Sequence, residues 1–152
     1  MEKRMQNLLN GEEEEKDQSS GMHKTQKHSD ALTSQEAQSL HNRLVVIQAV
    51  NYKKQGYTNI KVKNANNSQS QPDQVDGYIP DLSAILDSQT MICEVETNDS
   101  INDLSTVDKW KAFDNSGHQF HLIIPNDDFN QVKEIVKDNG ISVDKYWCIK
   151  DY

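Results

Sequence analysis

Hydrophobic residues first recur at a regular interval in the segment from position 34 to position 55. They stand three or four residues apart, the spacing of one face of an α-helix, and they are Leu40, Leu44, Ile47 and Val50. Thr33 or Ser34 can cap the first turn with Glu36 nearby, and Gly56 follows the last turn. The pattern therefore predicts a helix from Ser34 to Gln55.

Shorter hydrophobic segments predict strands in the middle of the chain. The segment from Asn59 to Lys63 alternates, with charged outer residues, which is typical of an edge strand. Leu82 to Leu86 and Met91 to Glu96 are separated by Asp87-Ser88-Gln89, which suits an antiparallel hairpin with a turn of roughly three to five residues. The polar segment 64–76 is interpreted as a loop, either a plain connection or an approach to DNA.

The C-terminal half alternates helical and strand patterns. Five hydrophobic residues on one side predict a helix, and they are Ile101, Leu104, Val107, Trp110 and Phe113. A strand from Phe120 to Ile124 is stopped by Pro125, a helix from Asp127 to Asn139 is followed by a glycine, and Lys145 to Ile149 is a closing strand. Helices alternating with buried strands predict an α/β fold with crossover connections.

Length and composition suit a single domain. The chain has 152 residues, of which 34% are hydrophobic, and these can close one modest core. We expect the core in residues 33–152, because residues 1–32 are polar and carry the acidic block Glu12 to Glu15. We expect this leader to be disordered, with a short solvated helix or an interaction tail as alternatives.

The net charge limits which partners the chain attracts. A formal charge of -8 and a pI near 5.0 argue against general attraction to nucleic acid, so any DNA contact must be local. Cys93 and Cys148 lie in predicted buried strands without metal-pair or disulfide spacing, and we expect both in the core. No apolar run approaches a membrane span or a secretory signal, which predicts a cytoplasmic protein without a membrane partner.

Three acidic residues form the clearest candidate for chemistry. Asp81 follows Pro80 directly before one predicted strand, and the next strand carries Glu94 and Glu96. Alternation along a strand puts the two glutamates on one face, with Val95 on the other. Like charges so close raise each other's pKa unless a cation neutralises them, and Mg²⁺ or Mn²⁺ prefers oxygen ligands. The pattern predicts a cation site, with Asp81 as the third acid.

A longer set of segments resembles a known superfamily. Gly77-Tyr78-Ile79-Pro80-Asp81-Leu82, Glu94-Val95-Glu96-Thr97, Lys109-Trp110-Lys111-Ala112-Phe113 and Phe120-His121-Leu122-Ile123-Ile124-Pro125 look like the PD-(D/E)xK nucleases, including restriction-endonuclease-like and Holliday-junction-resolvase-like proteins. The resemblance covers roughly positions 34 to 152. It implies an α-β-β-β-α-β core with a mixed central sheet flanked by helices. Where the family usually has a lysine, two residues after the second acid, this chain has Glu96.

The resemblance also implies roles for individual residues. Asp81 and Glu94 hold Mg²⁺ or Mn²⁺ with the carbonyl of Val95, and Glu96 is a general base or a ligand to a second ion. The missing positive charge is expected from Lys109 on the following helix. Lys111 is the rival, with an amine that can simply extend into water.

Other residues are candidates for support or for DNA contact. The first helix of such nucleases often contributes a polar group, for which Glu36 and His41 are candidates, although Glu36 also suits a helix start and His41 a packing position. The basic cluster Lys53, Lys54, Lys61 and Lys63 can meet phosphates or protect an edge strand. Trp110, Tyr146 and Trp147 can stack on bases but are expected in the core, and His118 and His121 lack the spacing of a zinc site.

Three hypotheses follow from the sequence. The first is a divalent-metal-dependent endonuclease acting on DNA, with a homodimer as a possible assembly. The second is a catalytically inactive nuclease-fold module that binds nucleic acid or regulates. The third is an unrelated α/β protein in which the three acids are solvated at the end of the sheet.

Overall fold

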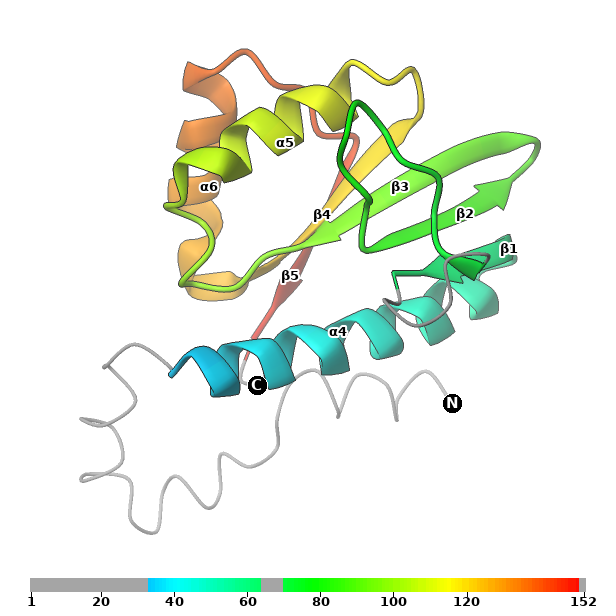
Figure 1. Cartoon of the computed structure of the whole chain (residues 1–152), viewed down its shortest axis with the longest axis horizontal. Coiled ribbons are helices and arrows are strands. Elements are labelled where there is room, and N and C mark those ends of the chain that lie inside the picture. Colours follow the sequence, from blue (N-terminus) through cyan, green and yellow to red (C-terminus); the bar gives the residue numbers. More distant parts are fainter. Residues whose placement is uncertain (1–32, 64–69, 151–152) are drawn as a thin grey trace, which may run out of the picture.

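A computed structural model describes residues 33–63 and 70–150 (Figure 1). Their elements run in the order α4 (Ser34–Lys54), β1 (Thr58–Val62), β2 (Leu82–Leu86), β3 (Gln89–Val95), α5 (Leu104–Asp114), β4 (Gln119–Pro125), the 3₁₀ turn η2 (Asn126–Asp128), α6 (Phe129–Asp138) and β5 (Lys145–Ile149). The predicted α/β class is confirmed. The acidic leader and positions 64–69 of the polar loop lie outside the described residues.

The five strands form one mixed sheet in the order β1-β2-β3-β4-β5. The pairs β1–β2 and β2–β3 are antiparallel, whereas β3–β4 and β4–β5 are parallel and are joined through α5 and α6. Asp87 and Ser88 both have positive φ, 52° and 67°, and Leu86 pairs directly with Gln89. A two-residue turn with two positive φ angles matches the twist of a hairpin, so the expected longer turn is wrong and Gln89 begins β3.

The helices cover the two faces of the sheet (Figure 1). α4 lies on one face, where Leu44 and Tyr52 pack with Cys93 and Val95. α5 and α6 lie on the other face, which carries Ile92. Because side chains alternate along β3, Glu94 points to the same side as Ile92 and therefore toward α5.

The start of α4 is fixed by a capping box. The backbone N–H of Glu36 donates to Oγ1 of Thr33 at 3.1 Å, and the backbone N–H of Thr33 donates to Oε1 of Glu36 at 3.0 Å. The predicted helix start is confirmed, and Gln55 is the C-cap rather than the last helical residue. Within the described part of the chain, no helix is both long and apolar enough to cross a membrane.

Three expected core positions are exposed, and a fourth is buried but lies outside its expected helix. Cys148 is exposed on the edge strand β5, so the expectation that both cysteines are buried is wrong for this one. Leu104 and Val50 are 88% and 43% exposed, because each lies on the outer side of its helix. Ile101 is buried, but it precedes α5 and packs from the connecting segment.

Candidate active site

Two predicted acids meet where β2 begins and β3 ends. The antiparallel register pairs Leu82 with Cys93, which brings Asp81 beside Glu94. The backbone N–H of Asp81 donates to Oε1 of Glu94 at 3.2 Å, and the backbone N–H of Val95 donates to Oδ2 of Asp81 at 2.9 Å. Both acids are 4% exposed. The predicted juxtaposition of Asp81 with Glu94 is confirmed.

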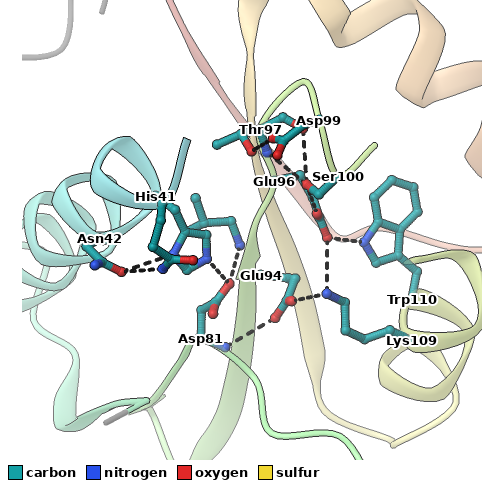
Figure 2. A network of polar contacts seen from close by, with 12 residues as sticks. His41, Asn42, Asp81, Glu94, Glu96, Thr97, Asp99, Ser100, Lys109 and Trp110 are labelled. Carbon is teal, nitrogen blue, oxygen red and sulfur yellow. Dashed lines mark hydrogen bonds and ion pairs between the residues drawn. The ribbon is translucent and has the colours of Figure 1, made fainter. Parts of the chain in front are cut away.

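Lys109 supplies a positive charge to this acidic group from α5 (Figure 2). Its Nζ lies 2.6 Å from Oε2 of Glu94 and 3.6 Å from Oε2 of Glu96. The two glutamates therefore lie on the same face of the sheet at the end of β3, as alternation predicts. A helix lysine thus reaches the acids although the position two residues after Glu94 holds another acid.

Burial and mutual repulsion raise the pKa of both glutamates. For Glu94, removal from water is the largest cause, the charge of Asp81 adds to it, and Lys109 opposes it. For Glu96, removal from water again dominates, while Lys109 and hydrogen bonds from Ser100 and Trp110 oppose it. Three acids face one lysine, so the group carries excess negative charge whenever its carboxylates are ionised.

The acids have the opposite effect on the lysine. Partial burial lowers the pKa of Lys109, but the charges of Glu94 and Glu96 outweigh it, and the pKa is raised above its ordinary value. The side chain is therefore an ammonium ion at neutral pH. It cannot serve as a general base there, but it can stabilise negative charge.

His41 adds a second cationic or donor group from α4. Its Nε2 lies 3.1 Å from Oδ2 of Asp81, and this hydrogen bond raises the pKa of the imidazole. The raised pKa favours the protonated imidazole, in which Nε2 carries a proton and can donate to Asp81. The structure thus places His41 in contact with Asp81. The sequence had left open whether this histidine belongs to the site or only packs in a half-buried position.

Glu96 is held by residues that the sequence did not single out for the site. Ser100 donates its hydroxyl to Oε1 at 2.6 Å, and Nε1 of Trp110 donates to Oε2 at 2.8 Å (Figure 2). Trp110 was expected in the core, and it is fully buried. The sequence offered one general signal for this contact, which is that the N–H of a buried tryptophan usually has a hydrogen-bond acceptor. That signal does not identify the acceptor.

The acids line a groove of about 800 Å³ between α4 and the segment that follows β3. α4 contributes a polar row to one wall, consisting of Ser34, Gln38, His41 and Asn42. The opposite wall contains Thr97, Asp99, Ser100 and Lys109. An open groove ending on buried acids suits a ligand that presents a charged group to its floor.

Several predicted supporting residues do not line this groove. The backbone N–H and the carboxylate of Glu36 both form hydrogen bonds of the capping box. Lys111 is exposed on α5. Lys63 lines the groove, but Lys53 and Lys54 occupy the last turn of α4, about 18 Å along the helix from His41. Lys61 is half-buried on β1. The four lysines therefore do not gather at the groove, and their binding to nucleic acid stays a prediction.

The donors fit a hard cation in kind. The resemblance assigns two carboxylates and one carbonyl, all oxygen ligands, and the acids outnumber the lysine that faces them. Residues 33–63 and 70–150 contain no cluster of three acidic, histidine or cysteine side chains placed to hold a metal ion. A metal here would depend on Asp81, Glu94 and the backbone of Val95.

Comparison with known proteins identified no relative of the chain. No protein-family model, no curated protein and no solved structure matches the chain.

Proposed function

We propose that the chain is a divalent-metal-dependent nuclease with a restriction-endonuclease-like fold that hydrolyses phosphodiester bonds in DNA. The observation that carries the proposal is the position of Lys109, whose Nζ lies 2.6 Å from Glu94 and 3.6 Å from Glu96. A lysine beside two acids at the end of a sheet is the constellation that the resemblance implies. Here it is assembled from α5 although Glu96 replaces the usual lysine.

Mg²⁺ or Mn²⁺ would be held by Asp81, Glu94 and the carbonyl of Val95. When bound, such an ion lowers the pKa of a water molecule and offsets negative charge on the phosphate. The buried acids support this assignment, because burial and then repulsion from Asp81 raise the pKa of Glu94, and a bound cation would offset both effects.

The chain's own groups have separate tasks in this proposal. Lys109 remains an ammonium ion because the pKa is raised by the acids, so it stabilises charge on the phosphate that is being cleaved. His41 donates to Asp81 at 3.1 Å and orients its carboxylate. The groove, with Lys63 on its wall, admits the nucleic acid strand.

The test is cleavage of labelled duplex, single-stranded and four-way-junction DNA in Mg²⁺, Mn²⁺ or EDTA. We expect cleavage that requires metal and is lost in Asp81→Asn, which keeps the shape of the side chain and removes its charge. Asp108→Asn is the matched control, because Asp108 is exposed on α5. Size-exclusion chromatography of the same samples tests the homodimer, and localisation in cells tests the cytoplasmic assignment.

The inactive module is the competing proposal, favoured by the net charge of -8 and by Glu96 at the usual lysine position. It predicts DNA binding without cleavage under every metal condition. That outcome would replace the nuclease proposal. Neither binding nor cleavage, together with no metal affinity, would leave an unrelated α/β sheet with acids of structural role only, and these acids are buried rather than solvated as the third hypothesis expected.

A further inference from the structure

Glu96 has less solvent contact than the other acids of the site. It is 1% exposed, compared with 4% for Asp81 and Glu94. Each of its carboxylate oxygens already accepts a hydrogen bond, Oε1 from Ser100 at 2.6 Å and Oε2 from Trp110 at 2.8 Å. These two donors fix the orientation of the carboxylate, and its Oε2 also lies 3.6 Å from Nζ of Lys109.

The two donors are themselves firmly placed. Trp110 is fully buried and follows Lys109 directly on α5. Ser100 lies in the segment before α5, where its Oγ accepts from the N–H of Thr97 at 3.1 Å and its carbonyl accepts from the hydroxyl of Thr106 at 2.7 Å. Glu96 therefore ties the end of β3 to the helix that carries Lys109 (Figure 2).

Lys109 has two acidic neighbours, and they differ in whether another role competes with the ion pair to the lysine. Glu94 lies nearer, at 2.6 Å, but it is also a proposed metal ligand. Glu96 lies 3.6 Å away and its carboxylate is fixed by two donors. When Glu94 is engaged elsewhere, Glu96 is the group that keeps the ammonium at the acidic site.

We propose that Glu96 is a positioning residue that orients Lys109, and that Ser100 and Trp110 hold Glu96 for this purpose. The inference rests on the proposed nuclease function, because Lys109 is oriented there toward a substrate phosphate. It replaces the two roles expected for Glu96 from the sequence, base and second-ion ligand. The group at the usual lysine position thus contributes by holding the lysine that has moved to the helix.

The test compares Glu96→Gln, Trp110→Phe and Ser100→Ala with the wild-type chain. We measure kcat and KM for the DNA that is cut best, and Mg²⁺ affinity by titration calorimetry without DNA. We expect kcat to fall about 10- to 100-fold, as when a supporting hydrogen bond is removed, while KM and the Mg²⁺ Kd stay within about threefold. Ser100→Thr keeps the hydroxyl and is expected to restore most of the kcat that Ser100→Ala loses.

Trp147→Phe is the matched control for Trp110→Phe. Trp147 is also packed against a core cluster, but its Nε1 has no hydrogen-bond partner among the residues described. Removing this N–H is expected to leave kcat unchanged. If Trp110→Phe does not fold, as judged by circular dichroism, Ser100→Ala removes the other donor and carries the same expectation.

Two results would overturn the proposal. A Mg²⁺ Kd raised tenfold or more in Glu96→Gln, about 1.4 kcal/mol, would make Glu96 a metal ligand. An unchanged kcat in both Glu96→Gln and Ser100→Ala would make the hydrogen bonds purely structural.

A separate measurement keeps the inference distinct from the nuclease proposal. Amine-reactive labelling, read by peptide mass mapping, reports how freely Lys109 moves, with the exposed Lys111 as the internal reference. If the wild-type chain cuts no DNA, the nuclease proposal fails and labelling decides the rest. Faster labelling of Lys109 in Glu96→Gln than in wild type supports the positioning role, and equal rates overturn it.

Discussion

Nζ of Lys109 lies 2.6 Å from Oε2 of Glu94, so an ion pair joins α5 to the end of β3. The lysine side chain is 24% exposed and that of Glu94 is 5% exposed. A buried carboxylate is costly without a counter-ion, and here the counter-ion faces the groove. The same pair therefore serves stability without metal and, in the proposed function, contact with a phosphate.

Replacing Lys109 by methionine tests both roles. We expect Lys109→Met to reduce kcat about 100- to 1,000-fold, because a fixed charge on the phosphate is lost. In EDTA we expect the free energy of unfolding to fall by about 1.5 to 3 kcal/mol, because the acids lose a charge-assisted partner. Mg²⁺ should raise Tm more in this variant than in wild type, since the ion replaces the missing charge. Activity assays and thermal unfolding check these outcomes.

Lys111→Met is the control for this prediction, because Lys111 is exposed two residues further along α5. It should leave kcat and the response of Tm to Mg²⁺ unchanged. Equal losses in the two variants would mean that Lys109 acts only through the overall charge of the helix.

The sequence predicted the site better where main-chain periodicity decides side-chain direction. Alternation along β3 was predicted correctly, whereas the register that brings Asp81 to Glu94 comes from a two-residue turn, shorter than the one expected. The partners of Glu96 could not be predicted in the same way. A tryptophan on the buried side of a helix looks like any core residue, and whether its N–H meets an acid depends on how α5 docks on the sheet.

The extent of the hydrophobic faces was predicted less well than their existence. Leu104 fits the helical spacing, yet it stands at the first residue of α5 and is 88% exposed. Periodicity identifies the hydrophobic face of a helix. It does not show how far along the helix the sheet covers that face. Cys148 is exposed for a related reason, because it lies on a strand that has a neighbour on one side only.

Substitution of Glu36 tests whether this residue only caps α4 or also supports catalysis. Since it forms a capping box with Thr33, Glu36→Gln keeps an acceptor in place and should leave metal-dependent cleavage within about twofold of wild type. Thr33→Ala should lower the free energy of unfolding by about 1 kcal/mol without changing the Mg²⁺ Kd. Urea unfolding and calorimetry check the pair. A large loss of cleavage in Glu36→Gln with normal stability would return Glu36 to the site.

His41 is expected to support metal binding through Asp81. Removing the 3.1 Å hydrogen bond in His41→Ala leaves Oδ2 of Asp81 with the N–H of Val95 as its remaining partner, and loss of such a supporting group typically weakens metal affinity about 10- to 100-fold. Arg43→Ala, on an exposed position of the same helix, is the control. Titration calorimetry with Mg²⁺ at pH 8 measures the effect. An unchanged Kd in His41→Ala would show that the contact only packs α4 against the sheet.

The pH dependence of stability should be controlled in part by His121, which does not line the groove and contacts Tyr52 of α4. The hydroxyl of Tyr52 lies 2.7 Å from Nδ1 of His121, and Nε2 of His121 lies 3.4 Å from Oε1 of Gln119, so a neutral imidazole with its proton on Nε2 can accept a hydrogen bond from Tyr52. Burial lowers its pKa to about 4 from an ordinary value of 6.5, with Lys145 adding to the effect. The unfolded chain therefore takes up this proton at higher pH than the folded chain does.

The sign follows from this difference in proton uptake. Stability from the neutral imidazole is fully present above pH 6.5 and is lost as the pH falls through about 4. We expect the unfolding free energy of wild type to fall by up to about 2 kcal/mol more than that of His121→Gln between pH 7 and pH 4. Urea unfolding across this range measures the difference, with the exposed His118→Gln as control. Parallel curves for wild type and His121→Gln would contradict a neutral, buried His121.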